Sequence, residues 1–182
     1  VAAVFYLFIG LFALYKLLNK RFSNLYSFIT VASVFLGTNL FYYAVIDTGM
    51  SHVYSFSMFS LYLLLLSNWN HFIGKQLKYG LLLGLLVGII VMLRPLNVLF
   101  VLFSFFLIPE IFSWRFFSKH PIFIAVFIIT VICIVTPQLF YWNYISGSPF
   151  YYSYGDESFS NVLSPKIFKL FIAPNSGHLL YN

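Results

Sequence analysis

The distribution of charged residues along the chain is the feature that most constrains its fold. Uncharged stretches of about fifteen residues or longer occupy 1–15, 22–46, 48–74, 79–93, 95–109 and 120–155. The hydrocarbon core of a bilayer is about 30 Å thick, and each helix that crosses it needs an uninterrupted apolar run of this kind. Of the 182 residues, 62% are hydrophobic and 8% are charged, whereas a soluble domain is about 25% charged. This composition argues against a water-soluble monomer and predicts a multi-pass membrane protein.

The fold class predicted from these runs is an all-α membrane protein with about six transmembrane helices and a structured external C-terminal segment. The spans are expected at 1–15, 26–46, 53–67, 79–93, 96–112 and 121–144. The segment 145–182 mixes aromatic residues with glycine, proline and polar residues, which is typical of turns outside the membrane. Because the chain begins with valine and ends without a closing apolar run, we expect it to be a truncated piece of a longer protein.

The basic residues predict the orientation of these spans. When the spans alternate across the membrane, seven of the ten basic residues fall on one side: Lys16, Lys20, Arg21, Lys75, Lys78, Arg115 and Lys119. The positive-inside rule assigns this side to the cytoplasm. Asp47, Arg94 and the segment 145–182 are then expected on the external side.

Other classes of function find little support in the sequence. The net charge is +6, but the basic residues are scattered between apolar runs, which argues against nucleic-acid binding. The single cysteine, Cys133, excludes an internal disulfide and a cysteine-rich metal site. The chain also lacks zinc-ligand spacing, a nucleotide-binding glycine loop and a serine nucleophile motif, so no divalent metal or nucleotide cofactor is indicated.

The fourth predicted span, 79–93, ends at an arginine followed by a proline. Fifteen helical residues extend only about 22 Å, so we expect Arg94 to lie below the outer headgroup level. Pro95 removes a backbone donor, and the polar groups freed by this break predict a water-lined cavity open to the outside. Gly80, Gly84 and Gly88 share one face of the same span, which favours close packing of a neighbouring helix.

Arg94 and His52 are the candidate residues for binding a lipid phosphate. A guanidinium can hold a phosphate by two parallel hydrogen bonds, and His52 follows the external hairpin that contains Asp47. Arg94 has the alternative roles of snorkelling to the interface or pairing with Asp47. For His52 the alternative is a solvated histidine at the start of a helix.

The segment 151–161 is the densest cluster of polar and aromatic residues in the chain. It contains Tyr154, Asp156 and Glu157, and tyrosines beside carboxylates suit sugars, whose apolar faces stack on rings while their hydroxyls bind acids. An interfacial aromatic belt with a solvated acidic turn is the alternative interpretation.

Six short motifs carry a resemblance to a known family. They are 37–43 (GTNLFYY), 50–56 (MSHVYSF), 93–97 (LRPLN), 137–139 (PQL), 154–157 (YGDE) and 173–177 (APNSG). Together they resemble bacterial integral-membrane glycosyltransferases of the GT-C class. The chain is similar in these motifs to dolichyl-phosphate-mannose protein mannosyltransferases and to the aminoarabinose transferases that act on lipid A.

The resemblance implies an inverting enzyme of the bacterial inner membrane. Such an enzyme transfers a sugar from a polyprenyl-phosphate donor to a protein, lipid or glycan acceptor on the external face. It implies that Arg94 binds the lipid phosphate with His52 as its neighbour. Tyr154, Asp156, Glu157 and Asn175 are then expected to line the path of the sugar or the acceptor.

The chain departs from the family at the catalytic base. The family's catalytic acid lies in a large external loop near the amino terminus, and no such loop occurs here, so we expect the base upstream and this fragment to be inactive alone. A lipid or oligosaccharide transporter or flippase, an oligosaccharide polymerase and a non-catalytic membrane scaffold stay open as alternatives. In the upstream sequence, an external loop with an Asp or an Asp-Glu pair directly after the first span favours the transferase, whereas a repeat of the six spans favours transport. A large outer loop with a second arginine favours the polymerase.

Overall fold

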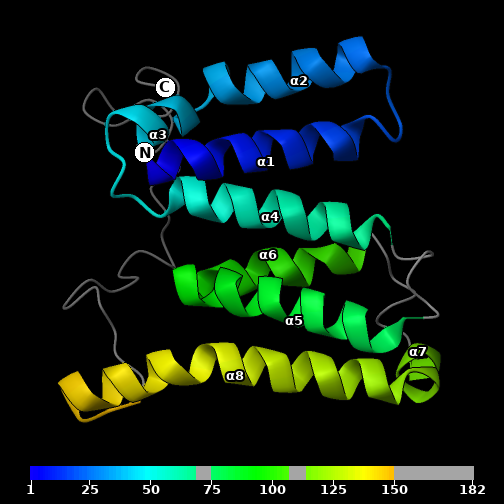
Figure 1. Cartoon of the computed structure of the whole chain (residues 1–182), viewed down its shortest axis with the longest axis vertical. Helices are drawn as coiled ribbons and strands as arrows, with labels where there is room; N and C mark the ends of the chain where they lie inside the picture. The colour runs from blue at the N-terminus through cyan, green and yellow to red at the C-terminus, as the bar shows by residue number, and fades with distance from the viewer. Residues whose placement is uncertain (69–74, 107–113, 150–182) are drawn as a thin grey trace, which may run out of the picture. The chain divides into compact units, whose positions relative to one another are not determined.

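The computed structural model describes residues 1–68, 75–106 and 114–149. All regular structure in these ranges is helical (Figure 1), which confirms the all-α class predicted from the sequence. The α-helices are α1 (Ala2–Leu18), α2 (Asn24–Gly37), α3 (Leu40–Val45), α4 (His52–Leu66), α5 (Gln76–Leu93), α6 (Val98–Phe103), α7 (Trp114–Lys119) and α8 (Pro121–Ser146). Two 3₁₀ turns, η2 (Pro95–Asn97) and η3 (Ser104–Phe106), flank α6.

The chain divides into two compact units, Val1–Tyr141 and Trp142–Asn182. The described part of the second unit is the C-terminal end of α8 and the turn that follows it. There Gly147 has a φ of 71° and donates its N–H to the Asn143 carbonyl at 2.9 Å. A left-handed glycine of this kind is the usual terminator of a helix, so it ends α8.

In the first unit, α1 packs closely against α4. The buried residues of α1 are small or aliphatic and recur every three or four positions: Ala3, Leu7, Gly10 and Ala13. A Cβ on Gly10 would lie 2.9 Å from the Ser57 Cα, so only glycine permits this approach. The Ser57 hydroxyl donates to the Tyr6 carbonyl at 2.8 Å. Small residues at a helix contact and interhelical hydrogen bonds are the devices that hold helices together in membranes.

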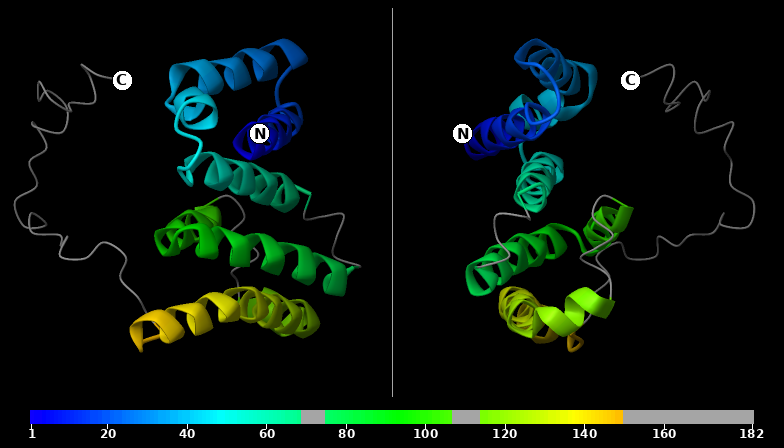
Figure 2. Two further views of the ribbon diagram at one scale, coloured as in Figure 1. Left: turned by 60° about the vertical axis from the view of Figure 1, so that its left-hand side comes forward. Right: turned by 90° about the vertical axis from the view of Figure 1, so that its right-hand side faces the viewer.

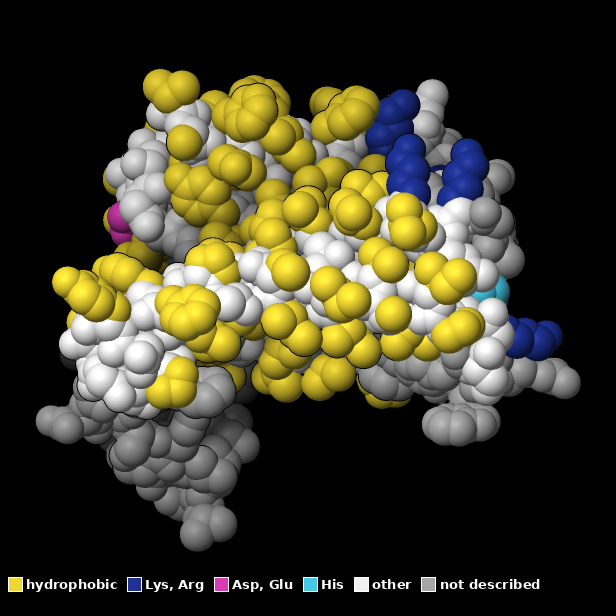
Figure 3. Space-filling model, turned by 60° about the horizontal axis from the view of Figure 1, so that its bottom comes forward, with side chains coloured by type: hydrophobic (Ala, Val, Ile, Leu, Met, Phe, Trp, Pro, Cys, Tyr) yellow, Lys and Arg dark blue, Asp and Glu magenta, His cyan; other side chains and the backbone are white. Residues whose placement is uncertain are grey.

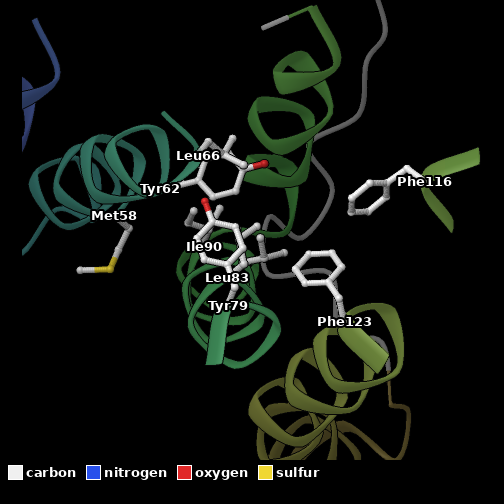
Figure 4. Packing of buried hydrophobic residues seen from close by; sticks show 9 residues of the cluster. Met58, Tyr62, Leu66, Tyr79, Leu83, Ile90, Phe116 and Phe123 are labelled. Carbon is white, nitrogen blue, oxygen red and sulfur yellow. The ribbon is translucent and has the colours of Figure 1, made fainter. Parts of the chain in front are cut away.

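The main apolar core lies between α4 and α5 and extends to α7 and α8. Figure 4 shows its residues, which are Met58, Tyr62, Leu66, Tyr79, Leu83, Val87, Ile90, Phe116 and Phe123. Both tyrosine hydroxyls in this core have partners. Tyr62 Oη and Ser104 Oγ are 2.7 Å apart, and Tyr79 Oη donates to the Leu65 carbonyl. Each ring is therefore buried without leaving a polar atom unpaired.

The glycine face of α5 is the contact surface for α8, which confirms the close packing predicted for it. A Cβ on Gly80 would lie 2.7 Å from the Phe123 carbonyl oxygen, and one on Gly84 would lie 2.8 Å from that of Phe127. At Gly88 the obstacle is the Ile134 side chain at 2.8 Å. Figures 1 and 2 show the two helices as neighbours along this face.

The span expected at 26–46 is not one continuous helix. α2 ends at Gly37, Thr38 has extended backbone angles, and α3 begins at Leu40. The Thr38 hydroxyl donates to the Val34 carbonyl at 2.7 Å and accepts the Leu40 N–H at 3.3 Å. A threonine side chain that bonds to the local backbone in this way replaces helical hydrogen bonds and ends the helix.

The fourth span is longer than the sequence predicted. α5 has 18 residues and a length of about 27 Å, because it starts at Gln76 rather than Tyr79. Its end at Leu93, before Arg94-Pro95, agrees with the prediction. In the region of the fifth expected span, the structure describes η2, α6 and η3 up to residue 106. The predicted start of this helix is therefore wrong by three residues, since the charge of Lys78 does not stop a helix. The depth of Arg94 in a bilayer stays a prediction.

Within the described residues, two helices, α5 and α8, are long and apolar enough to cross a membrane by length and composition. α1, α2 and α4 are also apolar but shorter. Large apolar side chains are exposed on several helices, including Phe8 on α1, Phe28 on α2 and Ile129 on α8. In the view of Figure 3, hydrophobic side chains cover most of the surface, and Lys and Arg side chains gather at one edge.

That edge belongs to what we call the basic end of the first unit, where α1 and α4 finish and α5 starts. Its described basic residues are Lys16, Lys20, Arg21, Lys75, Lys78 and Lys119. Lys20 Nζ donates to Ser67 Oγ at 2.7 Å and to Asn68 Oδ1 at 2.6 Å, which ties the ends of α1 and α4 together. Asp47, His52 and Arg94 lie at the opposite ends of these helices.

Candidate functional site

The candidate site is at the end of the first unit opposite the basic end, where α4 begins and α5 finishes. Arg94 is the first residue after α5, and His52 is the first residue of α4. The structure brings these two predicted residues close enough for the charge of Arg94 to act on His52. Tyr154, Asp156, Glu157 and Asn175, expected along the sugar path, lie outside the described residues.

The proline that follows Arg94 in the sequence determines the backbone conformation of Arg94. The residue has extended angles, with φ −156° and ψ 126°, because the ring of Pro95 excludes helical geometry in the residue before it. The Arg94 N–H still points to the Ile90 carbonyl at 3.4 Å, and the Arg94 carbonyl accepts the Asn97 N–H at 2.9 Å. These backbone groups find partners within the protein. The water-lined cavity at this break stays a prediction.

Asn97 links this break to the neighbouring helix. Its side-chain amide donates to Ser55 Oγ at 3.1 Å and to the Ile90 carbonyl at 3.2 Å. Ser55 lies on α4, three residues after His52, and is 7% exposed. Residues three apart on a helix share a face, so the bond to Ser55 holds the segment after α5 against the face of α4 that carries His52.

The His52 imidazole stacks on the ring of Tyr43. The two ring centroids are 4.4 Å apart and the planes differ by 29°. The tyrosine shields one face of a side chain that is otherwise exposed. This partial burial lowers the pKa of His52 below its ordinary value of 6.5, and the positive charge of Arg94 lowers that pKa further. At pH 7 the imidazole is therefore neutral, with one nitrogen able to donate a hydrogen bond and one able to accept.

Arg94 is half-buried, and no ion pair joins it to Asp47 or to another carboxylate in the described ranges. Asp47 lies in the turn between α3 and α4, where its backbone N–H donates to the Tyr42 carbonyl at 3.0 Å. The alternative in which Arg94 serves mainly to pair with Asp47 therefore gains no support. Asp47 is the one acidic side chain in the described ranges, and without an ion pair to it the half-buried guanidinium has donors that suit an anion.

Sequence reasoning did not assign roles to Tyr43, Ser55 or Asn97. All three are uncharged, so they lack the feature that distinguishes an ionisable residue in apolar surroundings. Each lies within a motif that carried the family resemblance, namely 37–43, 50–56 or 93–97. Within the described ranges, no group of three or more His, Cys, Asp or Glu side chains is close enough to hold a metal ion.

Comparison with known proteins identified no relative of this chain. A scan against protein-family models found no match, and searches of curated proteins and of solved structures found no similar protein.

Proposed function

We propose that this chain is a membrane-embedded part of an inverting glycosyltransferase of the GT-C type. In this proposal it transfers a sugar from a polyprenyl-phosphate donor to an acceptor on the external face of a bacterial inner membrane. Arg94 and His52 bind the lipid phosphate. Tyr154, Asp156, Glu157 and Asn175 line the path of the sugar or the acceptor.

The described surface supports a multi-pass location in the bilayer. α8 is 26 residues long, about 39 Å, and Phe123 is its one buried residue among those described. Water does not solvate a helix of this composition at low cost, whereas lipid does. The gathering of Lys16, Lys20 and Arg21 with other basic residues at one end agrees with a cytoplasmic location of that end.

The observation that carries the proposal is the state of Arg94. A half-buried guanidinium that has no carboxylate partner in the described ranges, next to a neutral histidine, lies at the end of an apolar bundle. Leaving such a cation without an anion is costly, so a structure that retains it is suited to an anionic ligand. A polyprenyl phosphate matches both features, since its chain dissolves in lipid and its phosphate reaches the bilayer surface.

Arg94 also fits the charge that develops in the proposed reaction. The acceptor oxygen bonds to the anomeric carbon as the bond from that carbon to the phosphate oxygen breaks. The leaving phosphate thereby changes from a singly charged diester to a monoester that carries a second negative charge. The guanidinium stabilises this second charge, which exists fully only after transfer. We assign no described residue as the base that accepts the proton.

The test is a binding measurement with farnesyl phosphate and with farnesol, which has the same chain without the phosphate. We expect the wild-type chain in detergent micelles to bind farnesyl phosphate at least tenfold more tightly than farnesol. Arg94→Gln should remove this preference, because the two charge-assisted hydrogen bonds are lost. Tenfold in affinity corresponds to about 1.4 kcal/mol.

The matched control is Arg21→Gln, which removes an exposed arginine at the basic end. It should leave both affinities unchanged, and all three proteins should have the same helicity by circular dichroism. Equal affinity of the wild type for farnesyl phosphate and farnesol, or an Arg94→Gln variant that keeps the preference, contradicts the proposed function.

A further inference from the structure

We propose that Asn97 and Ser55 are positioning residues that hold Arg94 beside His52 in the phosphate site. This inference rests on the proposed function for its biological meaning, but its geometry is independent of any ligand. Neither residue contacts the phosphate in this proposal. They act by fixing where the guanidinium lies.

The hydrogen bonds of Asn97 reach both helices and the segment between them. Its amide donates to Ser55 Oγ on α4 at 3.1 Å and to the Ile90 carbonyl on α5 at 3.2 Å. Its backbone N–H donates to the Arg94 carbonyl at 2.9 Å. One residue thus joins the start of α4, the last turn of α5 and the backbone of the arginine.

Without Asn97 the backbone at Arg94 has little else to fix it. α5 ends at Leu93, Arg94 is extended, and Pro95 has no N–H to donate. The N–H of Arg94 reaches the Ile90 carbonyl only at 3.4 Å, a long hydrogen bond. Among the hydrogen bonds described for this segment, that from the Asn97 amide to Ser55 Oγ is the one that reaches α4, so we infer that it fixes the position of Arg94 relative to α4.

The amide of asparagine suits this role because it offers two N–H donors, and both are used here. Aspartate has the same shape but would place a carboxylate against the Ile90 carbonyl oxygen. Leucine has a similar volume and no donor. Ser55 provides the acceptor on α4 and is nearly fully buried, so water does not readily replace it.

The experiment uses the pKa of His52 as a sensor of the position of Arg94. Asn97→Leu and Ser55→Ala exchange neutral residues for neutral residues, so neither adds nor removes a charge. Partial burial and the charge of Arg94 both lower this pKa, and the double variants with Arg94→Gln separate the two causes. The pKa is measured by NMR titration of the imidazole protons of the full chain in phosphatidylcholine nanodiscs. Other charged or titratable groups described at this end of the packed helices are the Val1 α-amino group, Tyr6, Tyr42, Tyr43, Asp47 and Tyr54, and none of them is altered.

We expect Arg94→Gln, Asn97→Leu and Ser55→Ala each to raise the pKa of His52. The double variant Asn97→Leu/Arg94→Gln should raise the pKa of His52 no more than Arg94→Gln alone, because the guanidinium that Asn97→Leu displaces is already absent. Ser57→Ala is the matched control, since it removes a different interhelical hydrogen bond of α4, to Tyr6, and should leave the pKa unchanged. The affinity for farnesyl phosphate should fall about three- to tenfold in Asn97→Leu and Ser55→Ala, with the affinity for farnesol unchanged.

The inference is overturned if Arg94→Gln raises the pKa of His52 and both Asn97→Leu and Ser55→Ala leave it at the wild-type value. It is also overturned if Arg94→Gln has no effect, since Arg94 is then not beside His52. A different outcome distinguishes failure of this inference from failure of the proposed function. If the pKa responds as expected but the wild type does not prefer farnesyl phosphate to farnesol, the positioning role holds and the phosphate site does not.

Discussion

Arg94 and His52 place a permanent positive charge next to a side chain whose charge depends on pH. Their proximity results from the end of α5 lying against the start of α4. Partial burial of the imidazole and, after it, the positive charge of Arg94 disfavour protonation of His52. In the proposed function, a bound anion offsets the charge of Arg94 and favours the protonated imidazole.

The pH dependence of stability follows from this depressed pKa. In the folded protein His52 binds its proton at lower pH than in the unfolded chain, where its pKa is the ordinary 6.5. The unfolded state therefore holds more protons in the window between the two values. We expect the contribution of His52 to stability to be complete above pH 6.5 and to be lost as the pH falls through the folded-state pKa.

This prediction is checked by urea unfolding of the chain in micelles at pH 7.5 and at several values below 6.5. Glutamine cannot be protonated in this range, so His52→Gln should reduce the change in the free energy of unfolding with pH. His120→Gln, at the other end of the first unit, is the control. A His52 titration midpoint at or above 6.5 in the ligand-free protein is incompatible with the prediction.

At the residue scale, the sequence predicted the charged members of the candidate site and missed the neutral residues that the structure places beside them. Arg94 and His52 were identified because an ionisable group in apolar surroundings is costly and needs a reason. Tyr43, Ser55 and Asn97 carry no such cost. Their roles depend on which atoms meet across two helices, and that information is not present in a pattern of residue types.

At the scale of elements, the glycine face of α5 makes a specific prediction about stability. A Cβ on Gly84 would lie 2.8 Å from both the Phe127 carbonyl oxygen and the Thr130 Cβ. Gly84→Val should therefore force α8 away and lower the free energy of unfolding by about 1–3 kcal/mol. The measurement is SDS unfolding followed by circular dichroism.

Gly37→Val is the control for Gly84→Val. A Cβ on Gly37 would meet nothing within 4 Å, and the residue has no left-handed φ. The substitution should change the free energy of unfolding by less than about 0.5 kcal/mol. An equal loss in both variants contradicts the packing of α8 on the glycine face.

The sequence predicted helix ends where a strong local signal exists and missed them where it does not. Pro95 identified the end of α5 correctly, because proline acts on the residue before it whatever surrounds the chain. The break at Thr38 was missed, since 22–46 carries no charge and hydropathy stays high across it. The break depends on two hydrogen bonds of the Thr38 hydroxyl, and an average of hydropathy over many residues does not detect them.

At the scale of the molecule, the separation of charge predicts the orientation in the membrane. The basic end carries Lys20 and Lys119, and the opposite end carries Asp47. In a Cys133→Ser background, we expect Gly49→Cys to react in intact cells with a membrane-impermeant maleimide. Lys119→Cys should react only after the membrane is permeabilised, because the positive-inside rule places it in the cytoplasm.

Both engineered cysteines should react equally after permeabilisation, which controls for accessibility, since Gly49 and Lys119 are exposed. Labelling of Lys119→Cys in intact cells, with protection of Gly49→Cys, reverses the proposed orientation. Equal labelling of both in intact cells rules out a single orientation across the membrane.

The contact between α1 and α4 has a consequence for how the chain is made. Tyr6 and Ser57, which share a hydrogen bond, are 51 residues apart. At a synthesis rate of about 5–20 residues per second, α1 emerges roughly 3 to 10 s before its partner exists. During this interval Gly10 and the other buried residues of α1 have no α4 to pack against. In the proposed membrane location, we expect lipid to contact this face of α1 until α4 is made.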